Sequence, residues 1–124
     1  MRVLVVDESG VLPWVVSRLV GPEVEIRAVD TFDAAVSLLR DDPPDAAVVS
    51  LTAARLPWCD FQHACAVRQP PVPVLYESCL SADPRDLGLE PIEGWAAFLA
   101  KPVARAEREA ALTRLLQQAR ALAV

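Results

Sequence analysis

The side chains in this sequence that could do chemistry follow short apolar runs, at the point where each run ends. A carboxylate pair follows the first run, hydroxyl groups end the third and fourth, and a lysine follows the fifth. These residues are Asp7, Glu8, Ser50, Ser78 and Lys101. Carboxylates can hold a cation, a hydroxyl can act as a nucleophile beside a base, and a lysine can neutralise an oxyanion. The groups meet in one shallow cleft if the runs are strands of one parallel sheet, because ligands bind beyond the carboxyl ends of such strands.

Five apolar runs recur along the chain and predict five strands. They are Val3–Val6, Val24–Val29, Ala46–Leu51, Val72–Tyr76 and Trp95–Ala100. The first, third and fourth are apolar nearly throughout, which is typical of central parallel strands that are covered on both faces. The second alternates between apolar and charged residues, which favours an edge strand with one wetter face.

Helical patterns lie between and after these runs. The clearest is Ala104–Leu122, in which leucines and alanines share one face. An earlier helix ends at Gly21-Pro22, and the next one begins with Asp30 or Thr31 as its cap. Weaker patterns, one short helix and one short or broken helix, occupy Phe61–Gln69 and Ser81–Gly94.

Strand and helix alternate five times, which predicts a doubly wound α/β fold with right-handed crossovers. An edge-like second run beside a central first run favours the strand order 2-1-3-4-5 in a five-stranded parallel sheet, the flavodoxin-like three-layer sandwich. The length of 124 residues fits one domain over 1–124, with no output domain visible.

Composition restricts the class of partner. The net charge of −5 and the absence of a basic stripe argue against nucleic acid binding. The apolar runs are much shorter than the roughly 20 residues of a membrane span, so no membrane partner is expected. The three cysteines are an odd number without a signal peptide, which indicates free thiols in a reducing, cytoplasmic setting.

Four stretches resemble the receiver domain of two-component response regulators. They come one per strand end and in the order of that family: Val3–Glu8, Pro44–Ser50, Pro73–Ser78 and Trp95–Pro102. The resemblance extends over essentially the whole chain. It implies a flavodoxin-like fold and a role in phosphorelay signalling, without an enzymatic activity of its own.

The resemblance also implies roles for individual residues. Asp7 and Glu8 match the acidic pair that helps to hold a divalent ion. Lys101 matches the lysine that neutralises phosphoryl oxygens, and Ser78 matches the hydroxyl that binds a phosphoryl oxygen on activation. Phe98 occupies the place of the aromatic residue that changes rotamer on activation.

Ser50 is the decisive departure from the family, because it stands where receivers have the aspartate that accepts phosphate. A serine hydroxyl is neutral and needs an adjacent base before it can attack phosphorus. Losing one carboxylate also weakens a cation site. We therefore expect no cofactor, or at most weakly bound Mg²⁺ at a vestigial site, and we expect Lys101 to form an ion pair with one of the acids. The loop that reaches Pro57 is also longer than in the family.

Two clusters suggest other chemistry. A serine hydrolase would place Ser50 in a Gly-x-Ser-x-Gly turn, but no glycine flanks it. Cys59, His63 and Cys65 are potential zinc ligands, although structural zinc takes four ligands at spacings such as C-x2-C. Small buried residues on a short helix are the better interpretation of the second cluster.

The sequence therefore predicts a divergent pseudo-receiver that signals by phosphorylation-independent contact. The expected partners are a histidine kinase, another receiver or an output module, and the final helix favours a homodimer as a further arrangement. The alternatives are a module phosphorylated at Ser50 or elsewhere, and the N-terminal module of a longer response regulator. Three tryptophans are candidate interface anchors: Trp14, Trp58 and Trp95.

Overall fold

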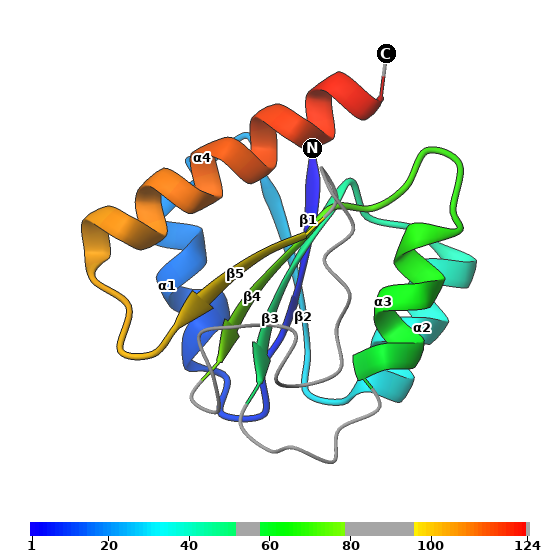
Figure 1. Cartoon of the computed structure of the whole chain (residues 1–124), viewed down its shortest axis with the longest axis horizontal. Helices are drawn as coiled ribbons and strands as arrows, with labels where there is room; N and C mark the ends of the chain where they lie inside the picture. Colours follow the sequence, from blue (N-terminus) through cyan, green and yellow to red (C-terminus); the bar gives the residue numbers. More distant parts are fainter. Residues whose placement is uncertain (52–57, 79–95, 124) are drawn as a thin grey trace.

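The computed structural model describes residues 1–51, 58–78 and 96–123. Strands and helices alternate through most of these residues. In chain order they are β1 (Arg2–Val6), α1 (Val11–Leu19), β2 (Glu25–Val29), α2 (Phe32–Asp41), β3 (Ala46–Leu51), α3 (Trp58–Ala66), β4 (Val74–Ser78), β5 (Ala96–Ala100) and α4 (Arg105–Leu122). All strand pairs are parallel, and the sheet has the order β2-β1-β3-β4-β5 (Figure 1). The predicted fold class and strand order are confirmed.

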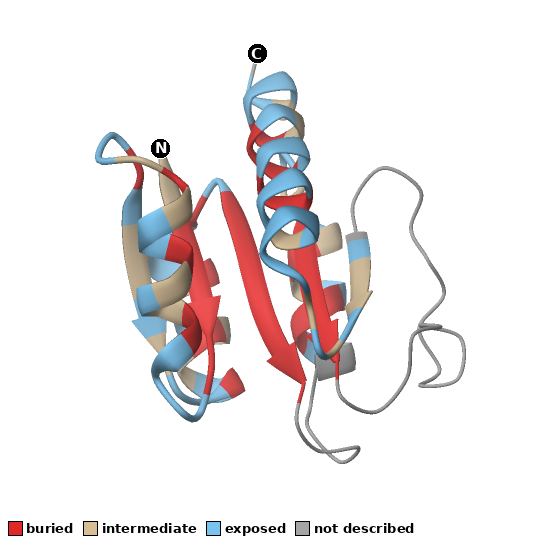
Figure 2. Cartoon of the chain, turned by 90° about the vertical axis from the view of Figure 1, so that its left-hand side faces the viewer, coloured by how far each residue is buried: buried red, intermediate tan, exposed pale blue. Residues whose placement is uncertain are grey.

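The helices cover both faces of the sheet, with α1 and α4 on one side and α2 and α3 on the other (Figure 1). Each face of the sheet packs against its helices to form a hydrophobic core, and alternate residues of β1 belong to the two cores. Val3 and Val5 pack with α1 and α4, whereas Leu4 and Val6 pack with α2 and α3. This division follows from the two-residue period of a strand. β3 and β4 are buried along their whole length (Figure 2).

The element boundaries differ from the predictions by a few residues. β4 begins at Val74 rather than Val72 and continues to Ser78. The third helix runs over Trp58–Ala66, earlier than predicted. It ends at Ala66, and Pro70 prevents a helix from continuing past Gln69. The weak helix predicted over 81–94 and the long loop to Pro57 lie outside the described residues.

Local signals explain where α2 starts and where α1 stops. The Thr31 hydroxyl accepts a hydrogen bond from the Ala34 amide at 3.1 Å, which caps α2. Gly21 follows α1 with a φ of 85°, in the left-handed region that glycine adopts without strain. None of the helices in the described part of the chain is both long and apolar enough to cross a membrane.

β2 forms one edge of the sheet and carries charged side chains. Two arginines and two carboxylates form a chain of ion pairs beside it. Glu25 lies 3.5 Å from Arg2 and 3.0 Å from Arg27, and Asp42 contacts both arginines as well. The predicted edge position of the second strand is confirmed, and these charges account for its alternating pattern.

Candidate functional site

The carboxyl ends of β1, β3 and β4 and the segment after β5 meet around one cavity of about 630 Å³. Its polar lining comprises Asp7, Ser9, Ser50, Glu77, Lys101 and Arg108. The structure therefore brings together three of the residues singled out from the sequence, namely Asp7, Ser50 and Lys101. The strand order explains this, because β3 lies between β1 and β4.

Ser50 and Lys101 are in direct contact. The Lys101 Nζ donates a hydrogen bond of 2.5 Å to the Ser50 Oγ, and Ser50 is only 8% exposed. The sequence predicted an ion pair between Lys101 and Asp7 or Glu8 instead. Among the described residues, no carboxylate lies within ion-pair distance of this ammonium. The difference has a local cause, which is the environment of Asp7.

Asp7 caps the first turn of α1. Its Oδ2 accepts from the Leu12 amide at 2.8 Å and from the Ser9 hydroxyl at 2.9 Å, while its Oδ1 accepts from the Ser9 amide at 3.1 Å. Gly10 makes this turn possible with a φ of 75°. The carboxylate thus satisfies an amide at the start of the helix that has no partner within the helix.

These hydrogen bonds decide the protonation of Asp7. Burial acts to raise its pKa, but the hydrogen bonds from Leu12 and Ser9, together with the positive charge of Lys101, outweigh burial and lower the pKa below its ordinary value of 3.8. Asp7 is therefore a carboxylate at neutral pH, and both of its oxygens are engaged by its own turn.

Replacing Asp7 with asparagine should lower the free energy of unfolding by about 1–2 kcal/mol near neutral pH, because hydrogen bonds to a charged acceptor are lost. The folded-state pKa of Asp7 is depressed, so its contribution is fully present above about pH 4 and disappears as the pH falls through the folded value. Urea titrations of both proteins between neutral pH and pH 3 measure the difference. Glu8→Gln is the control, with an expected change below about 0.5 kcal/mol. A difference for Asp7→Asn that does not vary with pH contradicts this account.

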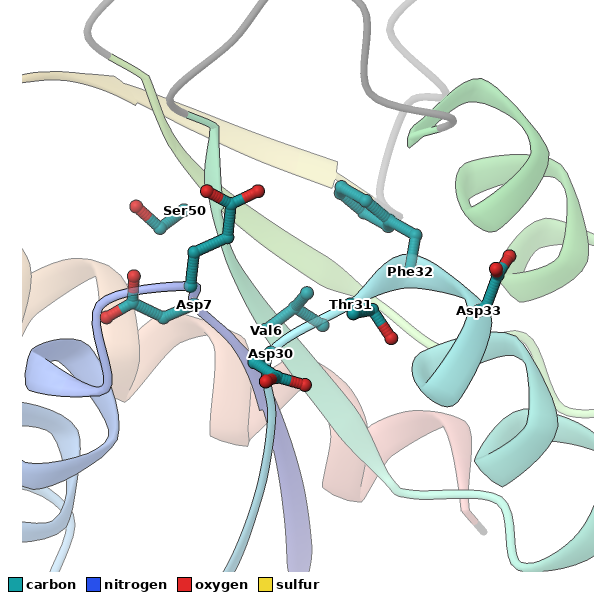
Figure 3. Close-up of a pocket in the computed structure, with 8 residues that line it drawn as sticks. Val6, Asp7, Asp30, Thr31, Phe32, Asp33 and Ser50 are labelled. Atoms are coloured by element: carbon teal, nitrogen blue, oxygen red, sulfur yellow. The ribbon is translucent and has the colours of Figure 1, made fainter.

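Glu8 faces a second, smaller cavity of about 190 Å³ that Asp7, Asp30, Asp33 and Ser50 also line. Figure 3 shows Asp33 well apart from Asp7, beyond Phe32. In the described segments, no group of three His, Cys, Asp or Glu side chains is arranged to hold a metal ion. Two carboxylates, one of them engaged with α1, and a hydroxyl bound by an ammonium do not fit a tightly bound divalent cation. A weak Mg²⁺ site at Asp7 and Glu8 stays a prediction.

Glu77 and Arg108 form a buried ion pair that sequence reasoning missed. The Arg108 Nε and Nη2 donate to the two oxygens of Glu77, both at 2.8 Å, and Glu77 is only 1% exposed. The hydrogen bonds that Arg108 donates to the Glu77 carboxylate raise the pKa of Arg108. Glu77 pairs with Ser50 in the register of β3 and β4, so this pair forms one wall of the site. The available signal was an acid directly after the fourth apolar run, at a position that belongs to β4.

Ser78 and Phe98 are not among the residues that line the cavity of about 630 Å³ at Ser50. Ser78 is buried at the end of β4, and its carbonyl accepts a hydrogen bond from the Lys101 amide at 2.7 Å. Phe98 is partly buried and packs on the α2–α3 side, with its ring centroid 5.9 Å from that of Tyr76. Their roles in activation, which the resemblance implies, stay predictions.

Cys65 is a residue of the apolar core. It is fully buried against α2 and β4, and burial raises the pKa of its thiol to about 12. A zinc ligand must be a thiolate, so this cysteine is a poor ligand. His63 is exposed on α3. The Cys59 side chain lies outside the described residues.

Several known structures share this fold. The signal receiver domain of a putative LuxO repressor protein from Vibrio parahaemolyticus matches with a TM-score of 0.70 and 21% identity, over 96% of this chain and 92% of that one. The response regulator domain of Thermotoga maritima CheB matches with a TM-score of 0.69 and 21% identity, over 100% and 97%. This chain has the receiver-domain fold. The receiver domain of DrrB, activated by BeF3, matches at 0.67 and 17% identity, over 94% and 97%. No protein-family model and no curated protein matches the sequence.

Proposed function

We propose that this chain is a receiver-like module of two-component signalling that acts by contact with partner proteins, without phosphorylation of an aspartate. The observation that carries the proposal is the hydrogen bond from Lys101 to Ser50 at the carboxyl end of β3. The receiver fold supports the signalling class, since receiver domains are the structures it resembles. The chemistry around Ser50 supports the mode of action.

Phosphoryl transfer needs an oxygen that can attack phosphorus. The Ser50 hydroxyl is uncharged, and its nearest charged partner is an ammonium group that donates a proton toward Oγ rather than accepting one. The Asp7 carboxylate lines the same cavity. It already accepts hydrogen bonds from Ser9 and Leu12, which lower its pKa and so make it a weaker base. Position 50 therefore lacks the anion, and among the described residues no carboxylate is hydrogen-bonded to the Ser50 hydroxyl to act as its base.

The partner of such a module is another signalling protein of the cytoplasm. The candidate classes are a histidine kinase, a second receiver and an output domain. A homodimer at the final helix α4 would have to use its exposed residues, with Val103 and Ala104 at its start, because Leu112, Leu115 and Leu116 are buried in the core.

Beryllofluoride with Mg²⁺ is the direct test of this mode of action. We expect no saturable change in the amide spectrum of the isotope-labelled protein, because the mimic binds to a carboxylate oxygen that position 50 lacks. The control is a receiver domain that beryllofluoride activates, such as that of DrrB. Saturable shifts at Ser78 and Lys101 contradict the proposal. A phosphate on Ser50 in protein isolated from its own cells would instead support the alternative of serine phosphorylation.

A further inference from the structure

Trp14 is a large apolar side chain that the fold leaves in solvent. It lies on α1 and is 61% exposed, and Val11 one turn earlier is exposed as well. The Arg18 guanidinium stacks 4.7 Å from the centre of its ring. Exposed aromatic residues beside arginines are typical of interaction surfaces, because both residue types are enriched where partners bind most strongly.

A groove adjoins this tryptophan between α1 and the start of α4, two helices on the same face of the sheet (Figure 1). The cavity has a volume of about 270 Å³. Its lining residues, the Trp14 groove, are Trp14, Val15, Arg18, Leu19, Arg105 and Arg108. Val15 and Arg108 also line the cavity at Ser50, so the two recesses share part of a wall.

The charge of the Trp14 groove is opposite to that of the molecule. Every charged residue in its lining is an arginine, although the chain has a net charge of −5. Arg108 is engaged by Glu77. Among the residues that the structure describes, no carboxylate lies within ion-pair distance of Arg18 or Arg105. Two guanidinium groups beside an exposed indole are therefore available to a ligand with negative charge.

We propose that the Trp14 groove docks an acidic peptide segment of a partner protein. Carboxylates of the segment pair with Arg18 and Arg105, and an apolar side chain between them packs on Trp14. A long polyanion such as duplex DNA is disfavoured because the rest of the surface repels it. The inference rests on the proposed function only in that it names a partner for a domain that acts by contact.

The probe is a short fluorescein-labelled peptide that alternates glutamate with leucine, titrated with the full chain at low salt. We expect the fluorescence anisotropy of the peptide to rise and saturate as the protein is added. The double variant Arg18→Gln/Arg105→Gln should bind the peptide about fivefold to tenfold more weakly. Trp14→Ala should weaken it by a similar factor. The matched control is Arg40→Gln/Arg120→Gln, which makes the same change in net charge at exposed sites outside the groove. Binding by this control should stay within about twofold of the wild type.

Four results overturn the proposal: no saturable binding by the wild type, equal losses in the two double variants, equal binding of a peptide with glutamine in place of glutamate, or tighter binding of a short DNA duplex. Circular dichroism verifies that each variant is folded, which is expected because Trp14 and Arg18 are exposed. The outcome is separable from the test with beryllofluoride. Loss of groove binding leaves the chemistry at Ser50 unaffected, and a response to beryllofluoride leaves the groove unaffected.

Discussion

Replacing Arg108 with methionine should lower the free energy of unfolding by about 3–5 kcal/mol, because it leaves a buried carboxylate without its partner. The Glu77 side chain is only 1% exposed at the wall of the cavity, whereas the Arg108 side chain is 19% exposed and can be replaced without steric conflict. A single domain of this size has a total stability of about 5–15 kcal/mol. The loss is therefore a large share of the whole, and urea denaturation at neutral pH measures it.

A second variant separates the lost pair from lost packing. Glu77→Leu/Arg108→Met removes both charges, and we expect it to recover most of the stability, since apolar replacements of buried pairs are often neutral. Arg120→Met, at an exposed position on the same helix, should change the stability by less than about 0.5 kcal/mol. If the double variant loses as much stability as the two single substitutions together, the ion pair is not the cause. If Arg108→Met does not fold at all, the recovery by the double variant still decides the question.

Replacing Ser50 with aspartate should create the response to beryllofluoride that the wild-type chain lacks. The new carboxylate lies beside Asp7 and within reach of Lys101, so the site gains the anion that both a cation and a phosphoryl mimic need. We expect Mg²⁺ to bind about tenfold more tightly or better. Titration of the amide spectrum with Mg²⁺, and then with beryllofluoride, measures both effects.

Ser50→Asn is the control for this gain, because it matches aspartate in size but has no charge. It should resemble the wild type in both titrations. If Ser50→Asp also fails to respond, the substitution at position 50 is not the departure that matters, and the hydrogen bonds that hold Asp7 to the start of α1 become the better explanation.

The fold was predictable because its signals are periodic. Continuous apolar runs gave β1, β3 and β4, and the observed bounds of β3 are those predicted. The meeting of Asp7, Ser50 and Lys101 followed from the topology, because parallel strands bring their carboxyl ends to one edge. The hydrogen bonds among these residues were not predictable. They depend on the left-handed turn at Gly10, which directs the Asp7 carboxylate to Leu12 rather than to Lys101.

The position of one member of the buried ion pair, Glu77, could be predicted from the sequence. Val74 and Tyr76 pack with α2 and α3, and Leu75 packs with α1 and α4. By the two-residue period of a strand, Glu77 must face the same side as Leu75, toward α4. Its partner was not predictable, because α4 carries four arginines and only the packing angle of the helix brings one of them to Glu77.

The ion pairs beside β2 have a consequence for how molecules meet one another. An open strand edge is a template on which a strand of another molecule can add, and sheets that grow in this way lead to aggregates. Charged side chains on an edge strand disfavour such addition, and at this edge Glu25 and Arg27 of β2 form ion pairs with Arg2 and Asp42. We therefore expect these charged side chains to disfavour growth of the sheet beyond β2 in a chain that is 53% apolar.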